Sequence, residues 1–207
     1  DWPSHPDLLD WLAIQFVEKG WNQKELIKLI VTSATYRQNS RASASLLARD
    51  PDNRLLARGP RHRLDAEVIR DNALALSGLL LNKIGGPSVY PYHPDGLWLE
   101  LNNRPNYSRK YPQGKGEALF RRSLYTYWKR TVPPPSMATF DAPEREFCLV
   151  RRSRTNTPLQ AFVLLHDPQF IEAARHLAAK MMAAAKDPGA RIAHGFRIIT
   201  ARTPSAR

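Results

Sequence analysis

The feature that most constrains this chain is a proline placed directly after a capping side chain, at the start of three apolar segments. Pro158, Pro168 and Pro188 each follow Thr or Asp and precede apolar residues at helical spacing. Proline is tolerated in the first helical turn, where Asp and Thr side chains accept hydrogen bonds from unpaired N–H groups. The 17 prolines are spread between apolar segments, which predicts many short helices joined by stiff turns.

Apolar residues spaced three and four apart predict further helices upstream. A capping box of Ser4 and Asp7 is expected to start the first helix, and Gly20 to end it. Asn22 and Glu25 form a second capping box, so the first two helices should be an antiparallel pair. Helices or helical turns are expected within 3–21, 22–38, 50–60, 64–83, 117–131, 157–166, 167–182 and 187–200. Strand patterns are sparse, and the predicted fold class is all-α, as an irregular multi-helix domain.

Residues 84–116 lack any clean periodicity and are rich in Gly, Pro, Asn and aromatic residues. Irregular stretches of this length inside a compact domain are uncommon and are often functional. The aromatic side chains either pack the loop onto the core or offer faces for sugars or bases to stack on. The aromatic candidates are Tyr90, Tyr92, Trp98, Tyr107 and Tyr111. We expect one helical domain over 1–207, as a piece of a longer chain.

The net charge of +12 permits binding to nucleic acid, an anionic glycan or a membrane surface. Of the 31 basic residues, 22 are arginine, which forms forked pairs with carboxylates and is the usual cation of internal ion pairs. Structural use of the arginines is therefore expected. No stretch approaches the length of a membrane span. The single cysteine, Cys148, excludes a disulfide within the chain.

Catalytic motifs are not found in the sequence. The stretch around Lys115 lacks the spacing of a phosphate-binding loop. His166 and Asp167 look like a metal-binding pair, but Pro168 follows at once, which predicts a helix end and a helix cap instead. The other histidines have no partner at metal-ligand spacing. No catalytic residue and no metal ligand are predicted.

An arginine group stands out beside several acids: Arg121, Arg122, Arg151, Arg152 and Arg154. Two interpretations remain open. The arginines can pair with carboxylates and fix the proline-rich loop to the helices. Alternatively, they can form an anion- or partner-binding site at the start of the Pro158 helix, where N–H groups also favour negative charge. The first interpretation predicts that Arg151 or Arg152 pairs with one of the acids Asp65, Glu67, Asp71, Asp141, Glu144 or Glu146.

Four long stretches, at 33–40, 63–92, 121–148 and 151–175, resemble the planctomycete-specific domain of unknown function numbered fifteen-fifty-three. The resemblance covers nearly the whole chain. His93 and His166 depart from the Gln and Asn more usual in the family, so neither is proposed as a catalytic residue. The resemblance implies an exported protein with a planctomycete-type cytochrome c domain upstream. A c-type haem would belong to that upstream part, because these residues hold no C-x-x-C-H motif and imply no cofactor here. The family carries no established activity.

The leading hypothesis is a non-catalytic scaffold or interaction domain of an exported, cytochrome-c-linked protein, with the other domains of the parent chain as partners. The alternative is an enzyme domain acting on glycans, sited at the aromatic loop and the acidic residues from Asp141 to Glu146; an anionic glycan is thus a further candidate partner. A third hypothesis, nucleic-acid binding, rests on charge alone and is less favoured. Localisation outside the cytoplasm is inferred from the resemblance only.

Overall fold

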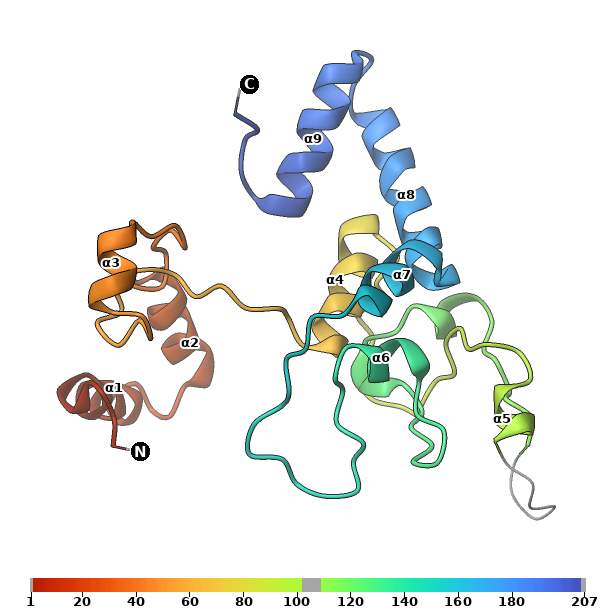
Figure 1. Ribbon diagram of the computed structural model, residues 1–207, viewed down its shortest axis with the longest axis horizontal. Helices are drawn as coiled ribbons and strands as arrows, with labels where there is room; N and C mark the ends of the chain where they lie inside the picture. Colours follow the sequence, from red (N-terminus) through yellow and green to blue (C-terminus); the bar gives the residue numbers. More distant parts are fainter. Residues whose placement is uncertain (1, 102–108, 206–207) are drawn as a thin grey trace. The chain divides into compact units, whose positions relative to one another are not determined.

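The computed structural model describes residues 2–101 and 109–205, and the regular elements in these ranges are helices without a strand. The predicted all-α class is therefore confirmed. Contacts within the chain divide it into two compact units, 1–62 and 63–207, each described by itself. Figure 1 shows the helices of both units.

The first unit holds α1 (Pro6–Glu18), α2 (Gln23–Thr32) and α3 (Ala44–Arg49). As predicted, Asn22 caps α2 by accepting a hydrogen bond from the Glu25 N–H at 3.2 Å. The predicted Ser4 cap on α1 is wrong, because His5 occupies the cap position and the Ser4 hydroxyl lies 3.0 Å from the His5 ring. Pro6 forces the helix to begin there.

The helical turn expected within 50–60 is also wrong, because the helix α3 precedes Asp50 instead of following it. The Asp50 carboxylate accepts the N–H groups of Arg54 and Leu55, each at 2.8 Å, and so organises a turn. Hydrogen bonding by the Leu55 N–H, above all, lowers the pKa of Asp50, although burial opposes this. A short acidic side chain that bonds nearby N–H groups competes with helix formation, which is why the prediction failed.

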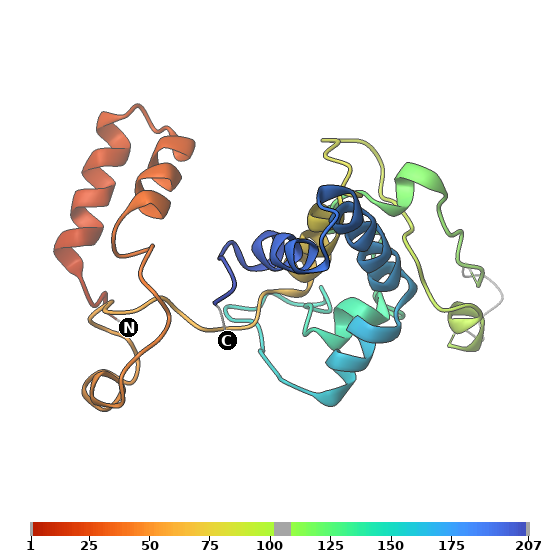
Figure 2. The ribbon, with the colours of Figure 1, turned by 90° about the horizontal axis from the view of Figure 1, so that it is seen from above.

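The second unit is built around α4 (Ala66–Ser77) and α8 (Pro168–Ala184), which pack against each other. The helix α9 (Pro188–Thr200) returns along α8, as Figures 1 and 2 show. The helix α7 (Pro158–His166) packs against α8 and α6 (Pro135–Thr139), and α6 also packs against α4. Three short elements complete it: α5 (Leu97–Glu100), η1 (Gly116–Leu119) and η2 (Ser123–Tyr125). The small apolar core lies where α4 meets α6.

That core is formed by Ala66, Met137 and Phe140, with Trp128 and Val163 packed against it. Each of the three central side chains is nearly inaccessible to solvent. Because the cluster is small, much of the remaining packing in this unit depends on polar contacts. Several of these buried polar contacts involve arginine, as described below.

The helix predicted for 117–131 is wrong. The chain there forms two 3₁₀ turns and pairs briefly with extended segments, through bridges from Leu81 to Arg121 and from Val89 to Thr126. Leu119, Arg121 and Ser123, in and between these turns, are buried. Residues 117–131 mix polar and apolar side chains, and buried polar contacts determine the conformation of the segment.

The three proline-started helices begin as predicted. Thr157 occupies the cap position of α7, and its N–H donates to the Gln160 side chain at 3.4 Å. Asp167 accepts from the Gln169 N–H at 2.9 Å to cap α8, and Asp187 accepts from the Ala190 N–H at 2.8 Å to cap α9. At α8 and α9, an Asp directly before proline thus marks the helix start.

Replacing Asp167 with Ala should lower the free energy of unfolding by about 1 kcal/mol, the usual effect of a lost cap. The Asp167→Asn variant should lose less, because its amide oxygen can still accept from the Gln169 N–H. Burial raises the pKa of Asp167, so removal of its charge also relieves some desolvation. Urea unfolding of both variants measures the difference; equal losses would contradict the capping role.

Candidate functional site

A buried arginine outside the predicted group lies at the centre of the second unit. The Arg70 guanidinium donates to the carbonyl oxygens of Arg121 and Leu119, each at 2.8 Å, and to the side chain of Gln169. The residue is 2% exposed. Burial lowers the pKa of Arg70 to about 10, with neighbouring Asp71 opposing the shift, so it stays protonated at neutral pH. Arg70 therefore acts as an internal clamp.

Of the five predicted arginines, Arg121 is also internal. It donates to the carbonyl oxygens of Lys83 at 2.9 Å and Gly85 at 2.6 Å, and its guanidinium lies 3.8 Å from the centre of the Tyr125 ring. These contacts fix the chain that follows α4. The adjacent Arg122 points outward, half-exposed, 3.7 Å from the Asp71 carboxylate.

Arg152 pairs with α4, which confirms the prediction that Arg151 or Arg152 meets an acid. Its guanidinium lies 2.7 Å from the Glu67 carboxylate and 3.8 Å from that of Asp65. Arg151 and Arg154 are exposed. Burial, the largest single effect, acts to raise the pKa of Glu67. The hydrogen bond from Arg152 and the other favourable contacts together outweigh burial, so the pKa of Glu67 lies below its ordinary value.

Asp141 is held by a residue that the sequence analysis did not single out. The guanidinium of Arg63 donates to its carboxylate, and Thr155 adds its N–H at 2.8 Å and its hydroxyl at 2.9 Å. These hydrogen bonds join the start of the second unit to both ends of the loop before α7. The sequence shows Arg63 just before α4, but no spacing in the sequence indicates that it contacts Asp141.

The five arginines therefore do not converge on one site. Arg121 is buried and bonded to carbonyls, and Arg152 is paired with Glu67. Of the five, Arg122, Arg151 and Arg154 are exposed; Arg122 directly precedes η2, whereas Arg151 and Arg154 lie in the loop before α7. The structural interpretation of Arg121 and Arg152 fits these contacts, because oxygens of the chain itself accept from the terminal guanidinium nitrogens of both residues.

The aromatic candidates, by contrast, do come together. Tyr111 stacks on His93 with ring centres 4.4 Å apart, and meets Trp98 edge-on at 5.1 Å. Tyr90 stacks on Tyr127 at 4.7 Å. Most of these rings contact one another and not open solvent, in line with packing of the loop. Tyr107 lies outside the described residues.

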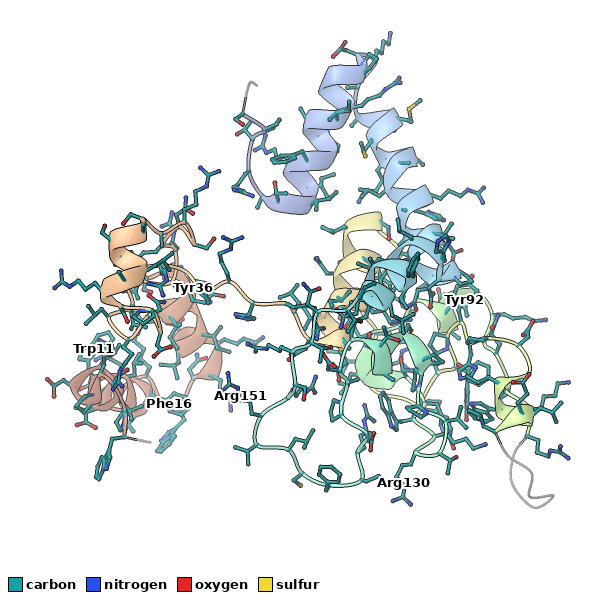
Figure 3. The ribbon with its side chains drawn as sticks, in the orientation of Figure 1. Trp11, Phe16, Tyr36, Tyr92, Arg130 and Arg151 are labelled. Carbon is teal, nitrogen blue, oxygen red and sulfur yellow. The ribbon has the colours of Figure 1, made fainter. Side chains whose placement is uncertain are left out.

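Tyr92 leaves this cluster and faces α8, where its hydroxyl donates to the Glu172 carboxylate at 2.9 Å. Figure 3 labels Tyr92 at this junction. Burial, and then the Glu172 contact, raises the pKa of Tyr92. The residue therefore ties the irregular segment to α8.

A cavity of about 390 Å³ lies beside the aromatic cluster. Its walls include His93, Trp98 and Tyr111, with Asp95 and Arg109 at its charged side. Within the described ranges, the Trp98 ring N–H and the His93 Nε2 are buried and have no hydrogen-bonding partner. Burial lowers the pKa of His93, which favours the neutral ring at pH 7. The cavity offers aromatic faces with charged groups at its edge.

A second cavity, of about 470 Å³, was not foreseen from the sequence. It lies where α6 and α7 meet the start of α8, and its lining includes Tyr92, Pro135, Phe162 and His166. The lining is largely apolar, and the Phe162 and His166 rings lie parallel along one side of α7, 6.1 Å apart. The sequence of α7 could have indicated this cavity, because the helix has more apolar residues than one buried face requires.

The acidic residues from Asp141 to Glu146 border a third cavity, of about 350 Å³, with Arg145 and Phe147 beside them. Glu144 and Glu146 are exposed, whereas Asp141 is engaged by Arg63. Over the described ranges, no three His, Cys, Asp or Glu side chains are grouped closely enough to hold a metal ion. The same residues include no helix long and apolar enough to cross a membrane.

The model of one protein family, described as "PSD1: Protein of unknown function (DUF1553)", matches residues 1–207. No curated protein and no solved structure shows significant similarity to the chain. The chain belongs to the DUF1553 family.

The Glu67–Arg152 pair predicts a pH dependence. Because the folded-state pKa of Glu67 lies below its ordinary value of 4.5, its contribution to stability is present above that value and is lost as the pH falls through the folded pKa. Glu67→Gln should therefore lower the free energy of unfolding at pH 7. In acid, the difference in this free energy between the variant and the natural chain should become smaller. Urea unfolding across this range measures the gap.

A double variant provides the control. In the Glu67→Gln background, Arg152→Met should add little further loss, because the partner of the guanidinium is already neutral. A gap between Glu67→Gln and the natural chain that stays the same from neutral to acid pH would contradict the pairing.

Proposed function

We propose that this chain is a non-catalytic interaction domain of an exported, cytochrome-c-linked protein, and that it docks other domains of its parent through the outer face of α7. The export and the cytochrome link rest on the family resemblance alone. The docking face rests on the chain's own residues.

The observation that carries the proposal is the exposure of apolar side chains on α7. Leu159, Phe162 and Leu165 are 58%, 56% and 66% exposed, although all are large and apolar. Gln160, a polar residue, is instead the buried one, and its amide donates to the Thr139 carbonyl at 3.0 Å. A polar anchor inside and apolar side chains outside is the reverse of an ordinary surface helix.

The cavity beside α7 strengthens this proposal. Phe162 and His166 form one wall, and Pro135 and Pro168 form others, so the exposed apolar face continues into a hollow of about 470 Å³. Contiguous apolar surface next to a concavity is typical of protein-binding sites. Ser136, Asp167 and Tyr92 supply a few polar groups at its edge, which can orient a partner.

The proposed role is also consistent with how the acids are used. Asp141 and Glu67 are bonded to Arg63 and Arg152. Both carboxylates are therefore already engaged by guanidinium groups of the chain itself. Of these acids, Asp141 belongs to the group on which the glycan-enzyme alternative depends. That alternative would need the exposed Glu144 and Glu146 to act as its pair of carboxyls.

The aromatic cavity is a second candidate binding site, for an anionic glycan. Its aromatic walls offer faces on which a sugar ring can stack, and Arg109 at its edge offers a positive charge. Arg109→Gln should weaken binding of an acidic oligosaccharide and leave binding of its neutral counterpart unchanged. Isothermal titration with the two saccharides separates these outcomes, and absence of binding by either would refute the candidate.

The docking proposal is tested with charged substitutions on α7. Phe162→Asp and Leu165→Asp should abolish co-elution of this chain with the separately produced remaining domains of its parent. Both side chains are more than half exposed, so the thermal melting temperature should stay near that of the natural chain. Size-exclusion chromatography and thermal melts measure the two effects.

The control is Leu124→Asp, which alters an equally exposed leucine, at 66%, away from α7. This variant should co-elute normally. If all three variants co-elute like the natural chain, or if Leu124→Asp alone disrupts the complex, the α7 docking proposal is wrong.

A further inference from the structure

The segment between α6 and α7 is a loop with a fixed base and an exposed tip. Asp141 and Thr155 close the base through the hydrogen bond between the Thr155 N–H and the Asp141 carboxylate at 2.8 Å, with Arg63 on the same carboxylate. Figures 1 and 2 show the chain leaving α6 in a wide blue-green excursion before it returns to α7. Compact surface loops whose ends lie close together are frequently functional.

Both arms of this loop are anchored as well. On the first arm, the Trp128 ring N–H donates to the Glu144 carbonyl at 3.1 Å, and the Arg145 guanidinium lies 4.6 Å from the centre of the Trp128 ring. On the second arm, Arg152 lies 2.7 Å from Glu67 on α4. The anchors leave residues 147–151, here called the tip, away from these contacts.

The tip is apolar and faces solvent. Phe147 is 67% exposed, Leu149 46% and Val150 107%. Cys148, between them, is exposed too. Four consecutive apolar side chains at the end of an anchored loop, held out of the core, indicate a surface that becomes covered by something other than water.

Positive charge borders the tip. Arg151 ends it and Arg154 follows, both exposed, and Figure 3 shows Arg151 projecting outward from its segment. The chain as a whole carries a net charge of +12. Exposed Glu144, Arg145 and Glu146 precede the tip, so the exposed charges at and around it are three positive and two negative. An apolar layer with negative charge at its surface matches this combination.

We propose that the tip inserts into the surface of a lipid bilayer that contains anionic lipids. Phe147, Leu149 and Val150 enter the boundary between headgroups and acyl chains, and Arg151 and Arg154 meet the headgroup phosphates. Apolar side chains beside basic ones are the combination that binds such interfaces. An anionic glycan would satisfy the arginines but would leave the apolar side chains in water.

The single cysteine makes the insertion directly measurable. An environment-sensitive fluorophore attached to Cys148 reports the polarity at the tip, since the chain has only 1 cysteine. Vesicles of phosphatidylcholine with a third of phosphatidylglycerol should shift its emission to the blue. Pure phosphatidylcholine vesicles should shift it much less, and high salt should reverse the shift, because screening weakens attraction to the charged surface.

Unlabelled variants separate the two parts of the proposal in vesicle sedimentation. Val150→Glu should abolish binding, and Arg151→Gln should lower the partition coefficient roughly fivefold, the effect of about one basic residue at an anionic surface. The matched controls are Ile84→Glu, at a position 86% exposed, and Arg175→Gln on α8, which should both bind as the natural chain does. Thermal melts check that every variant is folded.

Three results would overturn the proposal. The first is no blue shift and no sedimentation with anionic vesicles. The second is equal loss in Ile84→Glu and Val150→Glu, which would assign the effect to general surface charge. The third is a blue shift without vesicles that grows with protein concentration, which would assign the tip to contact between copies of this chain. A purely α7-dependent association with other protein domains would persist in all three cases.

Discussion

The guanidinium of Arg70 is the constraint on which the second unit depends. It reaches from α4 to the carbonyls of Leu119 and Arg121 and to Gln169 at the start of α8. A charge this deeply buried is tolerated only when its donors are satisfied, so each of the three segments must hold its position for the others to be stable. The break between η1 and η2 follows, because the carbonyls of Leu119 and Arg121 face Arg70 and not the next turn of a helix.

Other arginines near Arg70 also bond oxygen atoms of the chain, and this determines which side chains remain free on the surface. Arg121 fixes the chain after α4, Arg152 joins the loop before α7 to Glu67, and Arg63 closes that loop at Asp141. Although the chain carries a high net positive charge, several of its arginine side chains bond oxygen atoms of the chain itself. Two apolar surfaces remain outside, the outer face of α7 and the tip at 147–151, together with exposed arginines such as Arg151 and Arg154.

Local chemistry made part of this structure predictable from the sequence. The caps at Asn22, Asp167 and Asp187 are set by residues within three positions, and the pairing of Arg152 with an acid followed from the abundance of both charges. The helix expected over 117–131 failed because its conformation is decided by Arg70, some fifty residues away in sequence. The exposed apolar face of α7 was likewise hidden, because apolar spacing alone does not tell which face is buried.

Unfolding of Arg70→Met in urea tests this account most directly. The side chain is almost fully buried and of similar length, so the main change is the loss of its donors to Leu119, Arg121 and Gln169. Leaving these acceptors unpaired should lower the free energy of unfolding by about 3 kcal/mol or more. The exposed Arg175→Met on the same unit should change it by less than about 0.5 kcal/mol. An Arg70→Met variant as stable as Arg175→Met would contradict the claim that the unit is assembled around this buried guanidinium.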